Sequence, residues 1–412
     1  MLTRRQLIRS GAVAGVASAI APTFLWGARV ARGSSEGAPA AAPSNRTLVI
    51  IQMAGGNDGL NTVIPYSDSN YLGVRPNLRV DPATVLQLND RLGLNPAMAG
   101  LKNLWDANQL AIIEGVGYPN PSYSHFDSMA IWQTAAPKGE FSDGWLGRYF
   151  KQTAAEANAD FAGIDIGGAL APMFKTPGVT IPVVQSPAGY KLALDPRDAA
   201  ARLEAWRDLQ TAASTRQRYL PLIASAAVNA QRSTQVLARA VSEYQPSVTY
   251  GKDPLSGSLR VLASVIVQEA GTKVGYAMLG GFDTHSNERK TQDQLLTTLS
   301  DALSNFQADL VAHGKADDVL IVTWTEFGRR VKENGSQGTD HGDGGSMFVL
   351  GNGVKPGIYG DPPDLMQLDS NGSIQWSTDF RSVYATLLQG WLGVDSTGIL
   401  GARFTPVPFL AA

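Results

Sequence analysis

The sequence contains no cysteine, and only four of its 412 residues are histidine. Without thiols the chain has no disulfide, iron–sulfur cluster, cysteine nucleophile or zinc finger. Any metal site must therefore be built from carboxylates, imidazoles and hydroxyls. The positions of the four histidines are consequently informative about the chemistry of the protein.

A surplus of charge of one sign is also missing. The 34 basic residues nearly balance the 36 acidic ones, and the formal net charge is −2. Nucleic-acid binders usually carry a basic surplus on one face, so we expect no nucleic-acid partner. Apolar residues make up 44% of the chain and charged residues 17%, which supplies one large core and excludes general disorder.

Long, strongly apolar runs are absent, but the N-terminus has the pattern of a secretory signal. Arg4 and Arg5 precede a moderately apolar stretch from Gly11 to Ala28 and a small-residue segment that ends near Pro43. The paired arginines resemble a twin-arginine signal. The alternative is a membrane anchor, which Pro22 disfavours, as does a run shorter than the roughly 20 apolar residues of a span.

We therefore predict that residues 1–44 are a signal peptide and linker. This predicts export by the twin-arginine machinery to the periplasm or the extracellular space. It also predicts no stable membrane span after cleavage.

Patterns of buried strands alternate with helical patterns in the rest of the chain. Apolar, β-branched runs predict strands at 48–53, 110–113, 181–184, 274–279, 319–324 and 347–350. Amphipathic patterns predict helices at 195–243, 255–269, 287–312 and 379–392. This alternation predicts a mostly parallel sheet with helices on both faces. We predict one α/β domain over residues 45–412, with a helical insertion at about 195–245.

Polar, glycine-rich motifs follow the predicted strands, where open α/β sheets place their ligands. The first strand runs into Gly55-Gly56-Asn57-Asp58-Gly59, which lacks the spacing of a dinucleotide loop. Asp58 would repel a pyrophosphate and suits a cation, or else caps a turn. After strand 274–279, Asp283 and His285 can converge on one ion, although Asp283 could instead anchor the loop.

Two further motifs combine acidic residues with histidine or arginine. Glu326 follows strand 319–324 and stands beside Arg329 and Arg330, which predicts a metal ligand with anion-binding neighbours, or a helix-terminal ion pair. Asp340 and His341 lie in a glycine-rich turn before the next strand and form a typical oxygen and nitrogen ligand pair.

Hydroxyl groups follow the second predicted strand. Ser122, Ser124 and His125 precede a short helix, and a serine at a helix N-terminus has its alkoxide form stabilised by the helix dipole and by any adjacent cation. Ser124 is the first candidate nucleophile and Ser122 the second. The fourth histidine, His313, precedes Gly314 at the predicted end of a helix, which indicates a structural role.

Taken together, these motifs resemble the DUF1501 family of exported bacterial proteins, which is grouped with the alkaline phosphatase and sulfatase superfamily. The resemblance rests on Gly55 to Thr62, Ser124-His125-Phe126, Gly281 to His285, Thr325 to Arg329 and Thr339 to Gly342, and it covers the chain from Asn45 onward. It implies an alkaline-phosphatase-like sandwich with a mostly parallel central sheet.

The resemblance also implies one or two divalent metal ions and assigns residues to them. Asp283, His285 and His341 correspond to the ligands of one ion. Such a site with two imidazoles suits Zn²⁺ or Mn²⁺. Asp58 and Glu326 correspond to the ligands of a second ion.

One position departs from the superfamily pattern. Superfamily enzymes commonly place a histidine ligand where this chain has Phe327. An all-oxygen second site would favour Mg²⁺, Mn²⁺ or Ca²⁺, unless Asp340 or His125 joins it. A single bound metal is the alternative.

The resulting functional hypothesis is a metal-dependent hydrolase that acts on phosphate esters, or less readily sulfate esters, of small molecules or envelope polymers. The serine attacks, His125 lies beside it, and Arg329 holds the ester oxygens. The C/S-x-P-x-R motif of sulfatases is missing around Ser122. One alternative is a non-catalytic envelope protein for binding or assembly, which Phe327 favours. A redox protein is disfavoured because no cofactor motif occurs.

Overall fold

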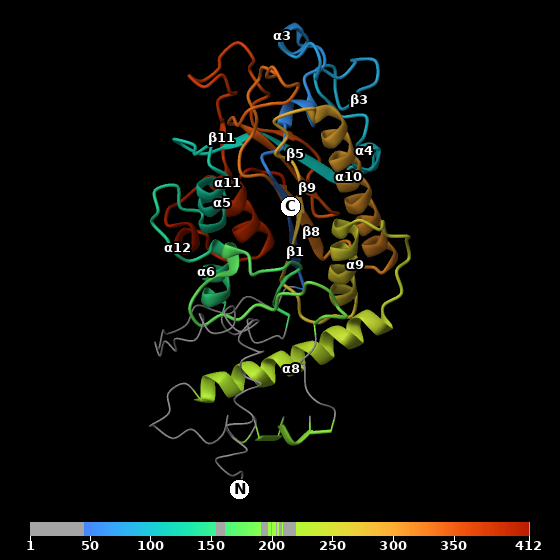
Figure 1. Ribbon diagram of the computed structural model, residues 1–412, viewed down its shortest axis with the longest axis vertical. Helices are drawn as coiled ribbons and strands as arrows, with labels where there is room; N and C mark the ends of the chain where they lie inside the picture. Colours follow the sequence, from blue (N-terminus) through green and yellow to red (C-terminus); the bar gives the residue numbers. More distant parts are fainter. Residues whose placement is uncertain are drawn as a thin grey trace.

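In a computed structural model of the chain, a mixed sheet of eight strands divides two layers of helices (Figure 1). The strand order is β10-β5-β9-β8-β1-β7-β6, and β11 pairs with β5. The strands are β1 (Thr47–Ala54), β5 (Leu110–Gly117), β6 (Gly163–Asp165), β7 (Val274–Gly280), β8 (Val319–Trp324), β9 (Gly345–Leu350), β10 (Gly357–Tyr359) and β11 (Thr378–Asp379).

The sheet is mostly parallel, as predicted. Strand β9 runs antiparallel to β5 and β8, whereas every other pairing in this sheet is parallel. The residues of β5, β8 and β9 are buried throughout, which is the pattern of strands covered on both faces. Strands β1, β7 and β8 therefore end at one edge of the sheet.

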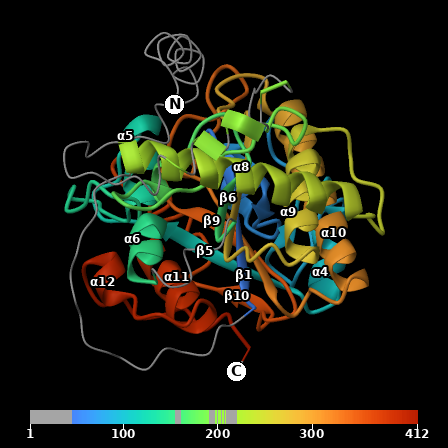
Figure 2. The same cartoon turned by 90° about the horizontal axis from the view of Figure 1, so that it is seen from below.

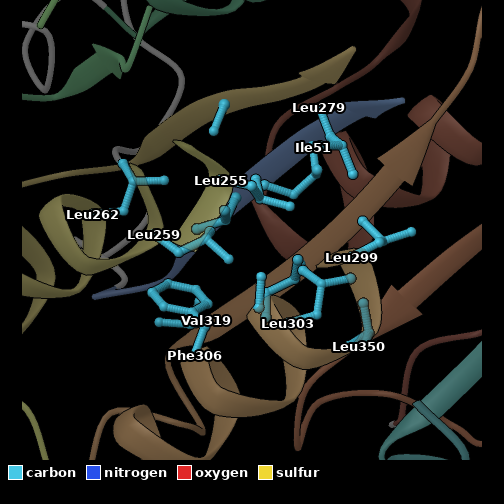
Figure 3. Close-up of a cluster of buried hydrophobic side chains, with 14 of the residues drawn as sticks. Ile51, Leu255, Leu259, Leu262, Leu279, Leu299, Leu303, Phe306, Val319 and Leu350 are labelled. Carbon is cyan, nitrogen blue, oxygen red and sulfur yellow. The ribbon is translucent and has the colours of Figure 1, made fainter. Parts of the chain in front are cut away.

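Helices cover both faces of the sheet. On one face lie α4 (Ala99–Asp106), α9 (Pro254–Val267) and α10 (Glu288–Ala312), and on the other lie α5 (His125–Thr134), α6 (Trp145–Gln152) and α11 (Phe380–Thr386) (Figures 1 and 2). Alternate residues of β1 enter the two cores, as a pleated strand requires. Figure 3 shows the first core, which contains Ile51 of β1, Leu255 of α9 and Leu303 of α10.

Smaller elements surround this sandwich. Beyond the carboxyl end of β1 lie a short antiparallel sheet and α3, which share a third apolar cluster. These elements are η1 (Gly59–Asn61), β2 (Val63–Ile64), α3 (Ser69–Val74), β3 (Leu86–Gln87) and β4 (Gly93–Leu94). The remaining short elements are η2 (Pro172–Phe174), η3 (Leu387–Trp391) and α12 (Thr397–Leu400).

The structure describes residues 45–153, 161–190, 197–198, 200–202, 204–205, 208 and 220–411. The predicted signal at 1–44 and much of the predicted insertion lie outside these residues. The described part of the insertion includes α8 (Leu220–Glu243), whose Leu237 and Ala240 are buried in the core of α9 and α10. Helix α8 lies at the end of the molecule opposite α3 (Figure 1). It therefore does not cover the edge where β1, β7 and β8 end.

Most predicted elements are present, with local corrections. The predicted strand 181–184 is wrong, because it forms a single bridge between Val183 and Asp165. The predicted helix 379–392 is α11 followed by the π-helical turn η3. No helix within the described part of the chain combines the length and the hydropathy of a membrane span.

Candidate metal centre

The parallel strands bring three loops together at one edge of the sheet. Ala54 pairs with Gly280 at the ends of β1 and β7, and Gln52 of β1 pairs with Trp324, the last residue of β8. The loops that follow these strands therefore lie side by side. The N-terminal turn of α5 joins them through Ser128, whose hydroxyl donates to the backbone carbonyl of Glu326.

Three of the predicted site residues converge in this region. The ligand atoms of His125, Asp283 and His341 all lie within 4.8 Å of one another. His285 adjoins them, because its Nε2 is 2.9 Å from Nε2 of His341 and 3.0 Å from Oδ1 of Asp283. The centre thus contains three imidazoles and one carboxylate.

The other ring nitrogen of each imidazole faces an oxygen acceptor. Nδ1 of His125 lies 2.8 Å from Oε1 of Glu326, and Nδ1 of His341 lies 2.7 Å from the carbonyl oxygen of Tyr123. Nδ1 of His285 lies 3.5 Å from Oδ1 of Asp340. An ionised carboxylate and a carbonyl only accept hydrogen bonds, so the tautomer with its proton on Nδ1 satisfies these contacts and turns the Nε2 lone pair toward the convergence point, where a cation could bind it.

The three Nε2 atoms gather around Asp283, and those of His341 and His285 lie 3.1 Å and 3.0 Å from its Oδ1. Nε2 of His125 is buried and has no hydrogen-bond partner, 3.4 Å from Oδ2 of Asp283. Nε2 of His285 and Nε2 of His341 face each other at 2.9 Å. A cation between these nitrogens satisfies all of them, so the donor set fits a metal ion.

Asp283 is kept anionic by its neighbours. Burial by itself would raise the pKa of Asp283, but hydrogen bonds from Arg329 and His341 outweigh that effect and hold the pKa at about 2. Nη2 of Arg329 donates to Oδ1 at 2.8 Å. The carboxylate charge is therefore available to a cation at any pH near neutrality.

Arg329 differs from its predicted role in binding ester oxygens. Its side chain is fully buried and donates to the carbonyl oxygens of Gly55, Gly56, Phe282 and Thr339 as well as to Asp283. Because the side chain is fully buried, Arg329 directs no N–H group to solvent. In the structure Arg329 ties the three loops together and orients Asp283.

Phe327 forms an apolar wall beside the imidazoles. Its ring centroid lies 4.9 Å from that of His125 and 4.5 Å from that of His341. Gly56 makes room for this ring, since a Cβ atom at Gly56 would lie 2.3 Å from Cε2 of Phe327. The position that lacks an imidazole thus contributes packing, and the third imidazole comes from His125 at the start of α5.

Asp58 also differs from its predicted role, because it lies outside the group of imidazoles. Both of its carboxylate oxygens accept from Arg75, and both side chains are almost fully buried. Burial would raise the pKa of Asp58, but the Arg75 charge and hydrogen bonds lower it. Burial and the Asp58 charge raise the pKa of nearby Glu288. Arg75 follows no strand, and no local motif singles it out.

Glu326 and Asp340 contact the imidazoles at Nδ1, on the side away from the convergence point. Oε1 of Glu326 accepts from Gly55 N at 2.9 Å as well as contacting His125, and Oε2 is buried without a partner. The structure therefore places both acids where they orient histidines. This differs from their predicted position as direct ligands.

The two serines lie at the start of α5. Ser124 is the N-cap of α5 and is exposed, and its Oγ accepts from Asp127 N at a long 3.4 Å. Ser124 lies between Tyr123, whose carbonyl holds His341, and His125. Oγ of Ser122 accepts from Ser124 N at 3.3 Å.

The fourth histidine, His313, caps the C-terminus of α10 as predicted, and its Nδ1 lies 2.9 Å from the Asp309 carbonyl oxygen.

Solved structures with a similar layout share little sequence with this chain. Lipoteichoic acid synthase LtaP from Listeria monocytogenes has 10% identity and a TM-score of 0.36, over 82% of this chain and 75% of that chain. A protein of the alkaline phosphatase superfamily from Vibrio parahaemolyticus has 11% identity and a TM-score of 0.39, over 87% and 69%. The C-terminal periplasmic domain of EcEptC from Escherichia coli, in complex with Zn, has 11% identity and a TM-score of 0.35, over 75% and 73%.

These likenesses are too distant to transfer a substrate or a metal to this chain. No curated protein matches the sequence. A family model described as "Protein of unknown function (DUF1501)" matches residues 45–397, which is most of the chain. The motifs at the ends of β1, β7 and β8, the start of α5 and the turn before β9 all lie within that match. The chain therefore belongs to the DUF1501 family.

Proposed function

We propose that the protein is an exported, metal-dependent hydrolase of phosphate esters, with sulfate esters as less favoured substrates. One observation carries the proposal: three Nε2 atoms converge on one carboxylate while each Nδ1 faces an oxygen acceptor. In proteins this combination is typical of histidines that bind a metal through the second nitrogen.

The donor set favours one Zn²⁺ or Mn²⁺ ion per chain. His125, Asp283, His285 and His341 would hold it, since imidazole and carboxylate ligands suit these metals. When bound, such an ion lowers the pKa of a nearby hydroxyl group or water molecule and polarises an ester oxygen. A second ion at Asp58 is not part of the proposal, because Arg75 occupies both oxygens of that carboxylate.

Ser124 is the proposed nucleophile. Its hydroxyl is exposed at the N-terminus of α5, one residue from His125, and the helix dipole favours an alkoxide at that position. The Ser124 oxygen attacks phosphorus as the alcohol leaves, and water then hydrolyses the phosphoserine. Ser122 remains the second candidate, although its hydroxyl is turned back toward Ser124 N.

Metal content tests the centre directly. Purified protein, exposed to excess Zn²⁺ or Mn²⁺ and then desalted, is expected to retain one ion per chain by mass spectrometry of the metal. His341→Ala is expected to retain little, because it removes one converging nitrogen. His313→Gln is the matched control, since that histidine lies at the end of α10, and it is expected to retain one ion.

An assay of ester hydrolysis tests the proposed reaction. The metal-loaded protein is expected to hydrolyse an aryl phosphate, and Ser124→Ala is expected to abolish turnover while the metal content stays at one ion per chain. Full activity in Ser124→Ala would transfer the role to Ser122 or to water. A protein that binds metal but cleaves neither aryl phosphates, phosphodiesters nor aryl sulfates would contradict the hydrolase and favour a binding protein.

A further inference from the structure

We infer that the Tyr118 hydroxyl positions Ser124 for attack, through hydrogen bonds that hold the segment in front of α5. This inference rests on the proposed function and adds a positioning residue to the same reaction. Tyr118 directly follows β5 and its side chain is buried, so it acts on the nucleophile through its neighbours and does not contact the substrate.

The Tyr118 hydroxyl is the middle member of a directional series of hydrogen bonds. Oγ of Ser128 donates to the carbonyl oxygen of Glu326 at 2.5 Å, which uses its single proton. The Tyr118 hydroxyl lies 2.9 Å from this Oγ, so it donates to Ser128 and accepts from Ser122 N at 3.0 Å. The series therefore ties the segment before α5 to Glu326, the acid that contacts His125.

Residues 119–124 depend on such side-chain contacts for their position. Two of the six are prolines, which have no N–H group, and within the described ranges none of the other four donates its N–H to a backbone carbonyl. Ser122 N donates to Tyr118, and Ser124 N donates to Oγ of Ser122 at 3.3 Å. Ser124 is thus held by Ser122, which in turn is held by Tyr118.

The neighbours of Ser124 are tied to the imidazoles. The carbonyl oxygen of Tyr123 lies 2.7 Å from Nδ1 of His341. On the other side of Ser124, Nδ1 of His125 lies 2.8 Å from an oxygen of Glu326. Ser124 itself is exposed, and its Oγ accepts a long bond of 3.4 Å from a backbone N–H group. The direction of this oxygen therefore depends on how firmly the preceding residues are held.

Loss of the Tyr118 hydroxyl leaves Ser122 N without its acceptor and Oγ of Ser128 without its donor. Ser124 should then occupy a wider range of positions. A nucleophile displaced by about 1 Å can lose about 100-fold in rate. The imidazoles keep their own contacts, so metal binding should persist. We therefore expect the effect on kcat, with little change in KM or in metal content.

The experiment compares Tyr118→Phe with wild type and with Tyr71→Phe, the matched control. The Tyr71 hydroxyl is also buried, and it accepts from Val80 N at 2.9 Å and donates to Oδ1 of Asn61 at 2.7 Å. Both substitutions thus remove one bond from a backbone N–H and one bond to a side-chain oxygen. The kcat and KM for an aryl phosphate, the metal content and the Tm are measured for every protein.

For Tyr118→Phe we expect kcat to fall about 10- to 100-fold, while KM changes less than about threefold and one metal ion stays bound. Tyr71→Phe should lower the Tm to a similar extent and keep the kcat of wild type. Ser128→Ala breaks the next bond of the series and should lower kcat as Tyr118→Phe does. The double variant should lose little more than either single variant, because both break one series.

An unchanged kcat in Tyr118→Phe, or an equal loss in Tyr71→Phe, would overturn the inference and make Tyr118 a structural residue. A fall in metal content would also overturn it, since Tyr118 would then act on the imidazoles. If Tyr118→Phe does not fold, Ser128→Ala decides by the same criteria.

The Ser124→Ala variant separates this test from the proposed function. If Ser124→Ala is inactive while Tyr118→Phe and Ser128→Ala keep full activity, the inference alone is contradicted. If metal-loaded wild type hydrolyses no ester, the proposed hydrolase is contradicted, and the inference that rests on it is contradicted as well.

Discussion

Three aspartates at the ends of parallel strands have different surroundings. Asp58 follows β1, Asp283 follows β7, and Asp165 ends β6, which pairs with β7. Asp58 is buried against Arg75, and Asp283 is half exposed between Arg329 and three imidazoles. Asp165 is buried, accepts from Ala171 N at 2.6 Å, and leaves Oδ1 without a partner.

The comparison shows that the end of a parallel strand does not by itself make an aspartate a metal ligand. Arg75 satisfies both oxygens of Asp58, which therefore has no lone pair directed at a shared point. Arg329 takes only Oδ1 of Asp283, so Oδ2 still faces His125 at 3.4 Å. Asp283 keeps one carboxylate oxygen that Arg329 does not occupy, and its side chain is half exposed. These two features distinguish a candidate metal ligand from a structural ion pair.

The different surroundings also shift the pKa values of the three aspartates in different directions. Burial favours the neutral acid in all three, and the neighbouring cation decides whether that effect prevails. Hydrogen bonds from Arg329 and His341 hold the pKa of Asp283 at about 2, whereas burial raises the pKa of Asp165 to about 7, with no cation paired to it in the described part of the chain. Aspartates at the ends of neighbouring parallel strands thus have opposite pKa shifts.

The largest expected effect is on the Asp58 pair. Arg75→Met should lower the free energy of unfolding by about 3–5 kcal/mol, because it leaves a buried carboxylate without its partner. Urea unfolding of metal-free protein measures this change. The added substitution Asp58→Asn should recover part of the loss, since it removes the unpaired charge.

Arg79→Met is the matched control for this variant. Arg79 is an exposed arginine near α3, and its replacement should change the stability by less than about 0.5 kcal/mol. If Arg75→Met unfolded with the stability of wild type, the structural role of the Asp58 pair would be refuted. If it left stability unchanged but altered metal content, Asp58 would belong with Asp283.

Local sequence patterns were sufficient to predict the strands and the helix that position this site. The β-branched runs of β1, β7 and β8 and the helical pattern of α10 predicted the sheet and hence the edge where the loops meet. The Gly314 position identified His313 as a helix cap. The grouping of Asp283, His285 and His341 followed from their motifs and the resemblance to the family.

The side chains that pair with each acidic residue, and so decide its role, could not be predicted from local sequence patterns. Arg75 is 17 residues from Asp58, and Glu326 is 201 residues from the histidine it contacts. Such pairs depend on the three-dimensional packing of loops. The short strands β6, β10 and β11 were missed for a related reason, since they contain only two or three residues and take their geometry from the neighbouring strand.

The substitution Asp165→Asn tests how the raised pKa of this aspartate affects the stability of the protein. The folded pKa of about 7 lies above the unfolded value, so the native state favours the neutral acid. This contribution is fully present below the unfolded pKa of about 3.9 and is lost as the pH rises through about 7. The amide stays neutral, so Asp165→Asn should be more stable than wild type at pH 8 by about 2–4 kcal/mol, with little difference near pH 4.

Urea unfolding of metal-free wild type and Asp165→Asn, in steps from pH 4 to pH 8, measures this difference. Histidine titration affects both proteins and cancels in the comparison. A stability difference that is the same at every pH would show that Asp165 does not titrate in this range. It would then resemble Asp58, whose charge is retained in the folded state.

The smallest expected effect concerns the acid that orients His125. Glu326→Gln keeps an oxygen that can accept from Nδ1 of His125 and from Gly55 N, but it removes the negative charge that makes the imidazole a better ligand. Zn²⁺ affinity, measured by competition with a chromogenic chelator, should fall about 10- to 100-fold. Glu114→Gln is the matched control, because that buried carboxyl accepts from Ser346 at 3.0 Å. An unchanged affinity would show that Glu326 does not act through His125, and a loss far beyond 100-fold would make it a direct ligand like Asp283.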